Sequence, residues 1–221
     1  MSIESINKRI YDLNGVILSN NVQTHQNPLM ERMLSIEFKF GFYLKPVDTP
    51  WAKAHEQEPI VDIGDFIEPL MPLYLENQSL FFQKIVDNYF PDNQLDCERC
   101  GQIHWLPKLF TPLTIGSGDY EEWMWMFTDE AIDKIKAFFQ TEDNIEFLLL
   151  ATSDGYPDTY FISLSDQNIN NPTIYGTDRT GYFSEIDVIG SFEEFLNQLF
   201  TQDELIQTIK TALDNCEESY L

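Results

Sequence analysis

The feature that most constrains the fold is a series of short apolar segments, separated by turns, between residues 147 and 176. Residues 147–152 (Phe-Leu-Leu-Leu-Ala-Thr) precede the sequence Ser-Asp-Gly-Tyr-Pro-Asp at 153–158, and Thr-Tyr-Phe-Ile-Ser-Leu follows at 159–164. A second polar turn leads to Thr-Ile-Tyr-Gly at 173–176. Gly, Pro, Asn and Asp favour the tight turns that join antiparallel strands. The sequence therefore predicts a small antiparallel sheet in this part of the chain.

Two amphipathic helices are predicted upstream of these segments. Apolar residues recur every three or four positions over 80–89, with Ser79 in the position of an N-cap. A second helix is predicted to begin after Thr128, because Asp129 and Glu130 are acids in a first turn and an apolar stripe follows them. Sheet and helices together predict an α+β protein.

Two capping patterns close the chain. Ser191 with Glu194, and Thr201 with Glu204, have the Ser/Thr-x-x-Glu spacing in which side chain and backbone cap a helix reciprocally. Each pattern precedes an apolar stripe. We therefore expect the chain to end in two short helices.

The N-terminal part gives a less regular pattern. Residues 33–44 alternate between apolar and polar, which is typical of a half-buried strand. Four prolines between 49 and 72 exclude one long helix there and favour a loop with short elements. Since no repeat, low-complexity tract or Gly/Pro-rich linker interrupts the 221 residues, a single α+β domain spanning 1–221 is predicted.

The order of elements over residues 145–200 resembles the C-terminal half of the SUKH superfamily. The similarity lies in the strand–turn–strand segment, the Ile174-Tyr175 strand and the closing Ser-Phe-Glu-Glu-Phe-Leu at 191–196. Leu70-Met71-Pro72 and Asn77 only weakly match the front half of that family. The resemblance implies a SUKH-like fold with an N-terminal elaboration. It also implies a protein-binding scaffold, because many members are immunity proteins that neutralise bacterial polymorphic toxins.

Charge indicates what kind of partner such a protein would bind. The chain has 37 acidic and 13 basic residues and a formal net charge of −24, and residues 111–221 carry 22 acids against four bases. A surface this negative repels nucleic acid and anionic lipid, and attracts basic proteins. With 43% hydrophobic residues, the composition is that of a folded protein and not of a disordered acidic chain. The predicted partner is a basic toxin protein, with no direct binding to nucleic acid or membrane.

Acidic residues near turns are the candidates for contacting that partner. Gly-Ser-Gly at 116–118 precedes acids and a Trp/Met run at 123–127, which can be either an interface hot spot or a strand buried on both faces. We expect the run to lie mostly in the core and the acids at its start to face solvent. The candidate partner-binding residues are Asp119, Tyr120, Glu121, Glu122, Asp154, Asp158, Asp178, Glu185 and Asp187.

One constellation has metal-ligand spacing. Cys97, Cys100 and His104 supply two thiols separated by two residues and a nearby imidazole, as at structural zinc sites. A zinc site normally needs four ligands, and no second Cys-x-x-Cys or His pair follows. Cys216, His25 or His55 would have to complete the site across the fold. We therefore expect no bound cofactor, with zinc as the alternative.

These observations favour a binding protein over an enzyme. The sequence contains no Gly-x-Ser-x-Gly elbow, phosphate-binding loop or His-Glu-x-x-His motif. The leading hypothesis is an immunity protein that neutralises a cognate toxin, such as a nuclease, by stoichiometric binding through an acidic surface. A regulatory or scaffolding adaptor that binds a host protein, and a metal-dependent hydrolase, are the alternatives. An odd number of cysteines, no signal-peptide pattern and no apolar window of about 18 residues predict a cytoplasmic protein.

Overall fold

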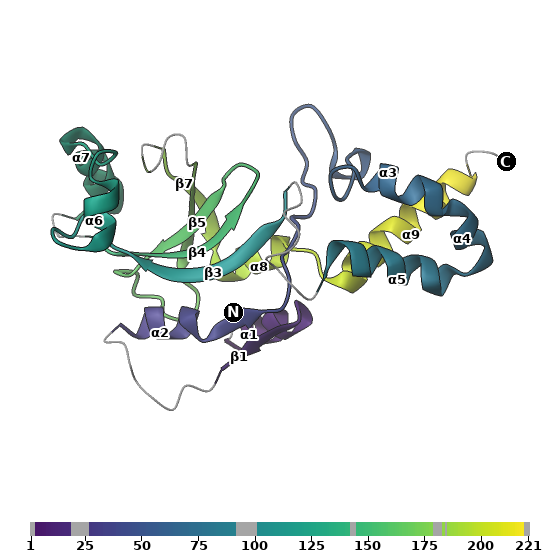
Figure 1. Ribbon diagram of the computed structural model, residues 1–221, viewed down its shortest axis with the longest axis horizontal. Coiled ribbons are helices and arrows are strands. Elements are labelled where there is room, and N and C mark those ends of the chain that lie inside the picture. Colours follow the sequence, from purple (N-terminus) through teal and green to yellow (C-terminus); the bar gives the residue numbers. More distant parts are fainter. Residues whose placement is uncertain are drawn as a thin grey trace.

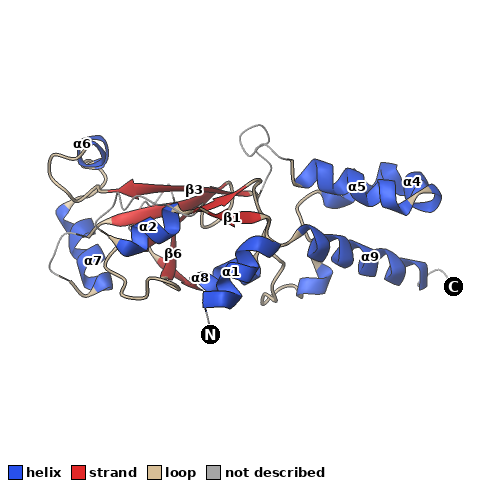
Figure 2. Ribbon diagram, turned by 90° about the horizontal axis from the view of Figure 1, so that it is seen from below, coloured by secondary structure: helices blue, strands red, loops and turns tan. Residues whose placement is uncertain are grey.

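The computed structural model describes residues 3–18, 27–91, 101–141, 145–178, 183 and 185–218, and the side chains of this part up to residue 214. It has two parts that lie side by side along the long axis of the molecule (Figures 1 and 2). One is a sheet body, built on a five-stranded sheet. The other is a helical arm, formed by α3, α4, α5 and α9. The α+β class predicted from the sequence is confirmed.

The five-stranded sheet is entirely antiparallel, with the strand order β3-β4-β5-β6-β7. Its strands are β3 (Ile103–Phe110), β4 (Phe147–Ser153), β5 (Thr159–Ser163), β6 (Thr173–Thr177) and β7 (Asp187–Ser191). The three central strands are those predicted from the apolar segments. The two edge strands were not predicted, because β3 contains Pro107 and charged residues and β7 has only two apolar side chains in a row, followed by a glycine.

Alternate residues of the central strands face two separate cores, as the period of two in a β-strand requires. Leu148, Leu150 and Ile162 belong to the larger core, together with apolar residues of α1 (Ile3–Asp12) and α8 (Phe192–Gln198). Phe147 and Phe161 point to the other face. There they pack in a smaller core with Phe110, Phe127, Ile135 and Phe183. α7 (Asp129–Phe139) covers this second face, so the sheet is buried on both sides.

The N-terminal segment adds a helix–strand pair to the sheet body. β1 (Gly15–Ile17) pairs with β2 (Ile36–Phe38) in a separate two-stranded sheet, and α2 (Pro28–Leu34) precedes β2. The strand predicted over 33–44 is therefore shorter than expected, because its first residues end α2. The predicted alternation is nevertheless seen in burial: Ile36, Phe38, Phe40 and Phe42 are buried, while Glu37 and Lys39 are exposed.

The helical arm follows the proline-rich segment, which forms short elements as predicted. These are η1 (Ala54–Glu56), α3 (Ile63–Ile67), η2 (Glu68–Leu70) and α4 (Met71–Glu76), followed by α5 (Gln78–Tyr89). The predicted N-cap of α5 was wrong by two residues. Asn77 is the cap, since its side-chain oxygen accepts a hydrogen bond from the Leu80 amide at 3.1 Å. α5 packs against α9 (Gln202–Glu218), and Lys210 of α9 lies over the ring of Phe82.

The predicted N-terminal caps of α7, α8 and α9 are confirmed. Thr128 accepts a hydrogen bond from the Ala131 amide at the start of α7. Ser191 and Glu194 form a reciprocal capping box on α8, and Thr201 and Glu204 form the equivalent pair of bonds on α9. The expectation of two short helices was wrong for α9. This helix has 17 residues and leaves the sheet body to become part of the arm (Figure 1).

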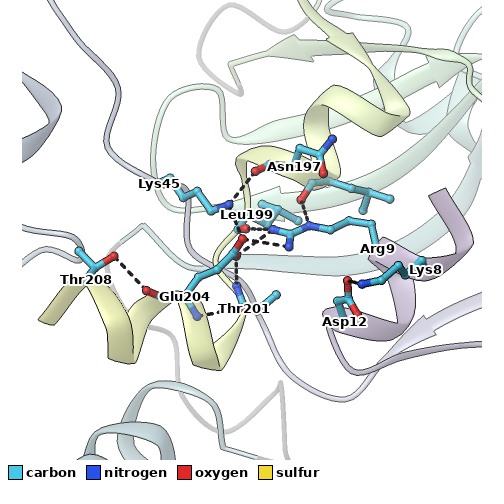
Figure 3. Close-up of polar contacts among 10 residues, drawn as sticks. Lys8, Arg9, Asp12, Lys45, Asn197, Leu199, Thr201, Glu204 and Thr208 are labelled. Carbon is cyan, nitrogen blue, oxygen red and sulfur yellow. Dashed lines mark hydrogen bonds and ion pairs between the residues drawn. The ribbon is translucent and has the colours of Figure 1, made fainter. Parts of the chain in front are cut away.

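An ion-pair network joins the sheet body to the arm (Figure 3). Arg9 of α1 donates hydrogen bonds to the carbonyls of Leu196 and Leu199, at the end of α8, and to both carboxylate oxygens of Glu204. Lys45 reaches the same carboxylate, at 2.8 Å, and the Asn197 carbonyl, at 3.0 Å. Three distant chain segments are thus fixed around Glu204. The bend between α8 and α9 is stabilised by this network.

Candidate partner-binding surface

The first group of predicted partner-binding residues lies on α6 (Gly118–Trp123), which follows the end of β3. The Ser117 hydroxyl donates to the Thr111 carbonyl at 2.7 Å and accepts from the Tyr120 amide at 3.0 Å. Asp119 accepts from the amide and the hydroxyl of Thr111, at 2.8 and 3.2 Å. Asp119 and Ser117 therefore dock α6 onto Thr111, the residue that follows β3. Asp119 is half-buried and acts as a positioning residue, while Glu121 and Glu122 are exposed.

The Trp/Met run at 123–127 is not the buried strand that we expected. α6 ends at Trp123, and the chain then turns, with the Met126 amide donating to the Trp123 carbonyl. This turn leaves Trp125 72% exposed and Met124 52% exposed. Only Phe127, at 6% exposure, lies fully in the core. The hot-spot interpretation therefore fits Trp125 and Met124 better than the core interpretation does.

A further apolar side chain lies close to these two in the sequence. Ile115, in the turn before α6, is 83% exposed. We use the term α6 surface for the five exposed residues Ile115, Glu121, Glu122, Met124 and Trp125. Large exposed apolar side chains among charges are typical of protein-binding sites, in which Trp is the most enriched anchor. The α6 surface has this composition.

The charge of this region is uniformly negative. No Lys or Arg occurs between Lys108 and Lys134, whereas the same stretch contains six acids. Two of these acids begin α7, and one of the two, Glu130, forms an exposed ion pair with Lys134 at 3.0 Å. A negative rim around an aromatic anchor attracts a positively charged protein and disfavours an acidic one.

The second group of predicted residues gathers around Tyr156, in the β4–β5 turn. The Tyr156 hydroxyl donates to Asp187 at 2.7 Å. This hydrogen bond, followed by desolvation and by the negative charges of Asp187, Glu185 and Asp178, raises the pKa of the phenol. Three predicted acids thus lie near one side chain that is 62% exposed. Asp154 is exposed in the same turn. We call these five residues the Tyr156 corner.

Asp158 does not belong to either surface. It is 6% exposed, and its carboxylate accepts a hydrogen bond from the Thr159 hydroxyl at 2.8 Å. Its backbone carbonyl accepts from the Ser153 amide and so closes the β4–β5 turn. Burial makes Asp158 inaccessible to a partner in this structure, and its position is explained by the turn.

The two groups lie at opposite ends of β4. Phe110, immediately before the α6 region, pairs with Phe147, whereas Ser153, immediately before the Tyr156 corner, pairs with Ile103. A strand of seven residues spans about 20 Å. The predicted residues therefore form two surfaces and not one. The α6 surface is the stronger candidate because it combines exposed charge with three large apolar side chains.

The exposed apolar residues of the α6 surface were not among the predicted partner-binding residues, because the core interpretation of the Trp/Met run was preferred. A helix start was nevertheless encoded: Ser117 precedes Asp119 and Glu121, which is the pattern of an N-cap followed by acids in the first turn. A helix at this point ends the alternation of the Trp/Met run, so that Trp125 need not point into a core.

The predicted metal ligands cannot be assembled from the described part of the chain. Cys97 and Cys100 lie outside the described residues, as do His25 and the side chain of Cys216. His104 is half-buried on β3, where it is paired with Thr152. Among the residues that the structure describes, no three His, Cys, Asp or Glu side chains lie close enough to hold a metal ion.

Two further findings bear on the class of protein. Within the described ranges, no helix is both long enough and apolar enough to cross a bilayer. Comparison of the chain with protein-family models, with curated proteins and with solved structures finds no match. The segments that resemble the SUKH superfamily form β4, β5, β6 and α8, and membership of that superfamily stays a prediction.

Proposed function

We propose that this protein is an immunity protein that neutralises a basic toxin by stoichiometric binding through the α6 surface. The observation that carries the proposal is the exposure of Trp125 and Met124 beside Glu121 and Glu122. An apolar side chain that the described residues leave exposed can anchor a partner and lengthen the lifetime of the complex. The surrounding carboxylates accelerate association with a cationic surface.

The mechanism would be occlusion of the toxin without any chemical step. A toxin that cleaves nucleic acid needs a basic cleft for its substrate, and such a cleft is complementary to a protein with a formal net charge of −24. The SUKH resemblance adds to this proposal, since it implies a scaffold for protein binding. The protein is accordingly proposed to have no enzymatic activity.

The test combines capture, protection and kinetics. A tagged copy is used to capture a stoichiometric partner from the native lysate, and the partner is then produced in a sensitive host with and without this protein. We expect the partner to be toxic alone and harmless when the two are co-produced. A captured partner that is not toxic would contradict the immunity function and favour an adaptor.

Association with the purified partner then tests the surface. The double variant Glu121→Lys/Glu122→Lys is expected to lower the association rate at low salt by about tenfold or more. Glu68→Lys/Glu76→Lys makes the same charge change at exposed positions of the arm and is the matched control. Glu185→Lys tests the Tyr156 corner. An effect of Glu185→Lys without one at α6 would move the interface to that corner.

A further inference from the structure

A pocket of about 590 Å³ lies where the arm meets the sheet body. One wall is a stripe of α9 that includes Glu204, Thr208 and Ala212, and the other wall comes from the segment between Lys45 and Pro59. Volumes of about 300–1,000 Å³ are typical of small-molecule sites. α6 lies at the end of the sheet body that is farthest from the arm (Figure 1), so the pocket is separate from the surface proposed for toxin binding.

The ion-pair network at one wall of this pocket, which includes Arg9 behind the lining residues, carries a local excess of positive charge. Glu204 is already engaged on both oxygens, by Arg9, by Lys45 and by the Thr201 amide. One carboxylate shared between two cations leaves a net charge of about +1 at this position. His55 is a second basic group in the lining. Such an excess is unusual in a chain whose formal net charge is −24.

Lys45 retains the capacity to bind one more acceptor. Its ammonium group donates to Asn197 O and to Glu204 Oε1 (Figure 3). An ammonium group has three donors, so one remains for an acceptor in the pocket. The hydroxyls of Thr208 and Thr211 are unavailable as donors, because each donates to the carbonyl four residues earlier in α9. Lys45 is therefore the cationic donor for an anion, and the His55 imidazole can donate a further hydrogen bond.

The rest of the lining is largely apolar. Pro46, Ala54, Pro59, Phe200 and Ala212 contribute carbon surface to the walls. The acidic residues between Lys45 and Pro59 lie outside the pocket lining, so they do not repel an anion from within it. Asp48 and Glu56 accept hydrogen bonds from the amides of Ala54 and Lys53, Glu58 accepts from the amides of Asp62 and Gly64, and none of the three lines the pocket.

We propose that this pocket binds a small monoanionic carboxylate with an apolar body. The carboxylate accepts hydrogen bonds from Lys45 and His55, and the apolar body covers the proline and alanine surface beside Phe200. A single excess charge and an apolar wall favour this class over a polyanion such as a nucleotide, whose additional charges would meet no cation among the lining residues.

Octanoate titration, followed by NMR of the histidine Cε1–H signals, tests the proposal. The chain has only three histidines, and His55→Gln assigns the signal of interest. We expect a saturable shift of the His55 signal below about 1 mM octanoate. Neutral octanamide, which has the same chain, is expected to bind at least about fivefold more weakly. The absence of a saturable shift up to about 5 mM octanoate, or equal binding of octanamide, would overturn the proposal.

Variants place the ligand in the pocket. Ala212→Phe places a ring in the cavity, eight residues along α9 from Glu204 of the ion-pair network, and is expected to abolish the shift. Lys45→Gln is expected to weaken binding at least about fivefold. Lys53→Gln removes a cation from the same segment but not from the pocket lining, and its affinity is expected to stay within about twofold of the unmodified protein. Undiminished binding to Ala212→Phe would contradict the location, even if Lys45→Gln fails to fold.

Discussion

Arg9 and Glu204 are 195 positions apart in the sequence, yet their side chains form a two-pronged ion pair with N–O distances of 3.1 and 3.0 Å. Burial alone would raise the pKa of the Glu204 carboxyl. Hydrogen bonds from Arg9, Lys45 and the Thr201 amide outweigh this effect and lower the pKa to about 2. Four donors around one carboxylate make this residue the electrostatic centre of the junction between sheet body and arm.

Glu204→Gln should destabilise the protein by about 1–3 kcal/mol at neutral pH, a range reduced for the partial exposure of the carboxylate. Because the folded-state pKa lies below the ordinary value of 4.5, the contribution of Glu204 is complete above about pH 4.5 and is lost as the pH falls towards about 2. Urea denaturation at pH 7 and pH 2.5 measures the free energy of unfolding of the unmodified protein and of Glu204→Gln. The difference between these two free energies should be smaller at pH 2.5.

Glu68→Gln is the control for that measurement, since Glu68 is an exposed carboxylate on the arm. Its free energy of unfolding should lie within about 0.5 kcal/mol of the unmodified protein at neutral pH. A pH-independent cost of Glu204→Gln would contradict the assignment of the stabilisation to the carboxylate charge.

Trp125 and Phe127 are expected to respond in opposite ways to truncation. Trp125→Ala should change the free energy of unfolding by less than about 0.5 kcal/mol, because the side chain is 72% exposed. Phe127→Ala should cost about 3–5 kcal/mol, because Phe127 is buried in the smaller core. Thermal or chemical denaturation distinguishes the two. A large loss of stability in Trp125→Ala would show that this side chain serves packing instead of partner binding.

Phe183 should be the most sensitive position in the described part of the β6–β7 connection. Its ring packs against Phe147 and Phe161, with centroids 4.8 and 4.7 Å away. Phe183→Ala is expected to cost about 3–5 kcal/mol, measured by denaturation. The residue has a left-handed φ of 60°, which glycine adopts without strain. Phe183→Gly should therefore be no more destabilising than Phe183→Ala, and a markedly larger loss would contradict this backbone argument.

Zinc content tests the sequence-based expectation about Cys97, Cys100 and His104. Protein purified without a chelator or a metal-affinity column should contain less than about 0.2 zinc per chain by plasma emission, because a structural site would hold its metal through purification. Stoichiometric zinc that disappears in Cys97→Ser/Cys100→Ser would establish the metal site instead.

The parts of the fold that could be predicted are those encoded by local signals. Apolar runs bounded by turn residues defined β4, β5 and β6, and side-chain caps fixed the starts of α7, α8 and α9. Edge strand β3 could not be predicted in this way. Its residues include Pro107 and Lys108, and the strand exists because it pairs with β4 across a stretch of sequence that contains α6 and α7.

The candidate site shows the same division. The exposure of Glu121 and Glu122 follows from their charge, and the sequence analysis anticipated it. The exposure of Trp125 could not be anticipated from hydrophobicity, which favours the interior. It results from the end of α6 at Trp123 and from the turn that follows. The prediction for Asp158 was wrong in the opposite sense: an acid expected to be exposed in a turn is buried by the hairpin to which it belongs.

The ion-pair network around Glu204 also determines the order in which contacts can form while the chain is being translated. Arg9 is synthesised well before its partners Leu196, Leu199 and Glu204, which follow it by 187, 190 and 195 positions. The part of α1 that packs against α8 therefore remains uncovered until α8 has been made. While the intervening residues are made, the part of α1 that α8 later covers is accessible to chaperones and to aggregation.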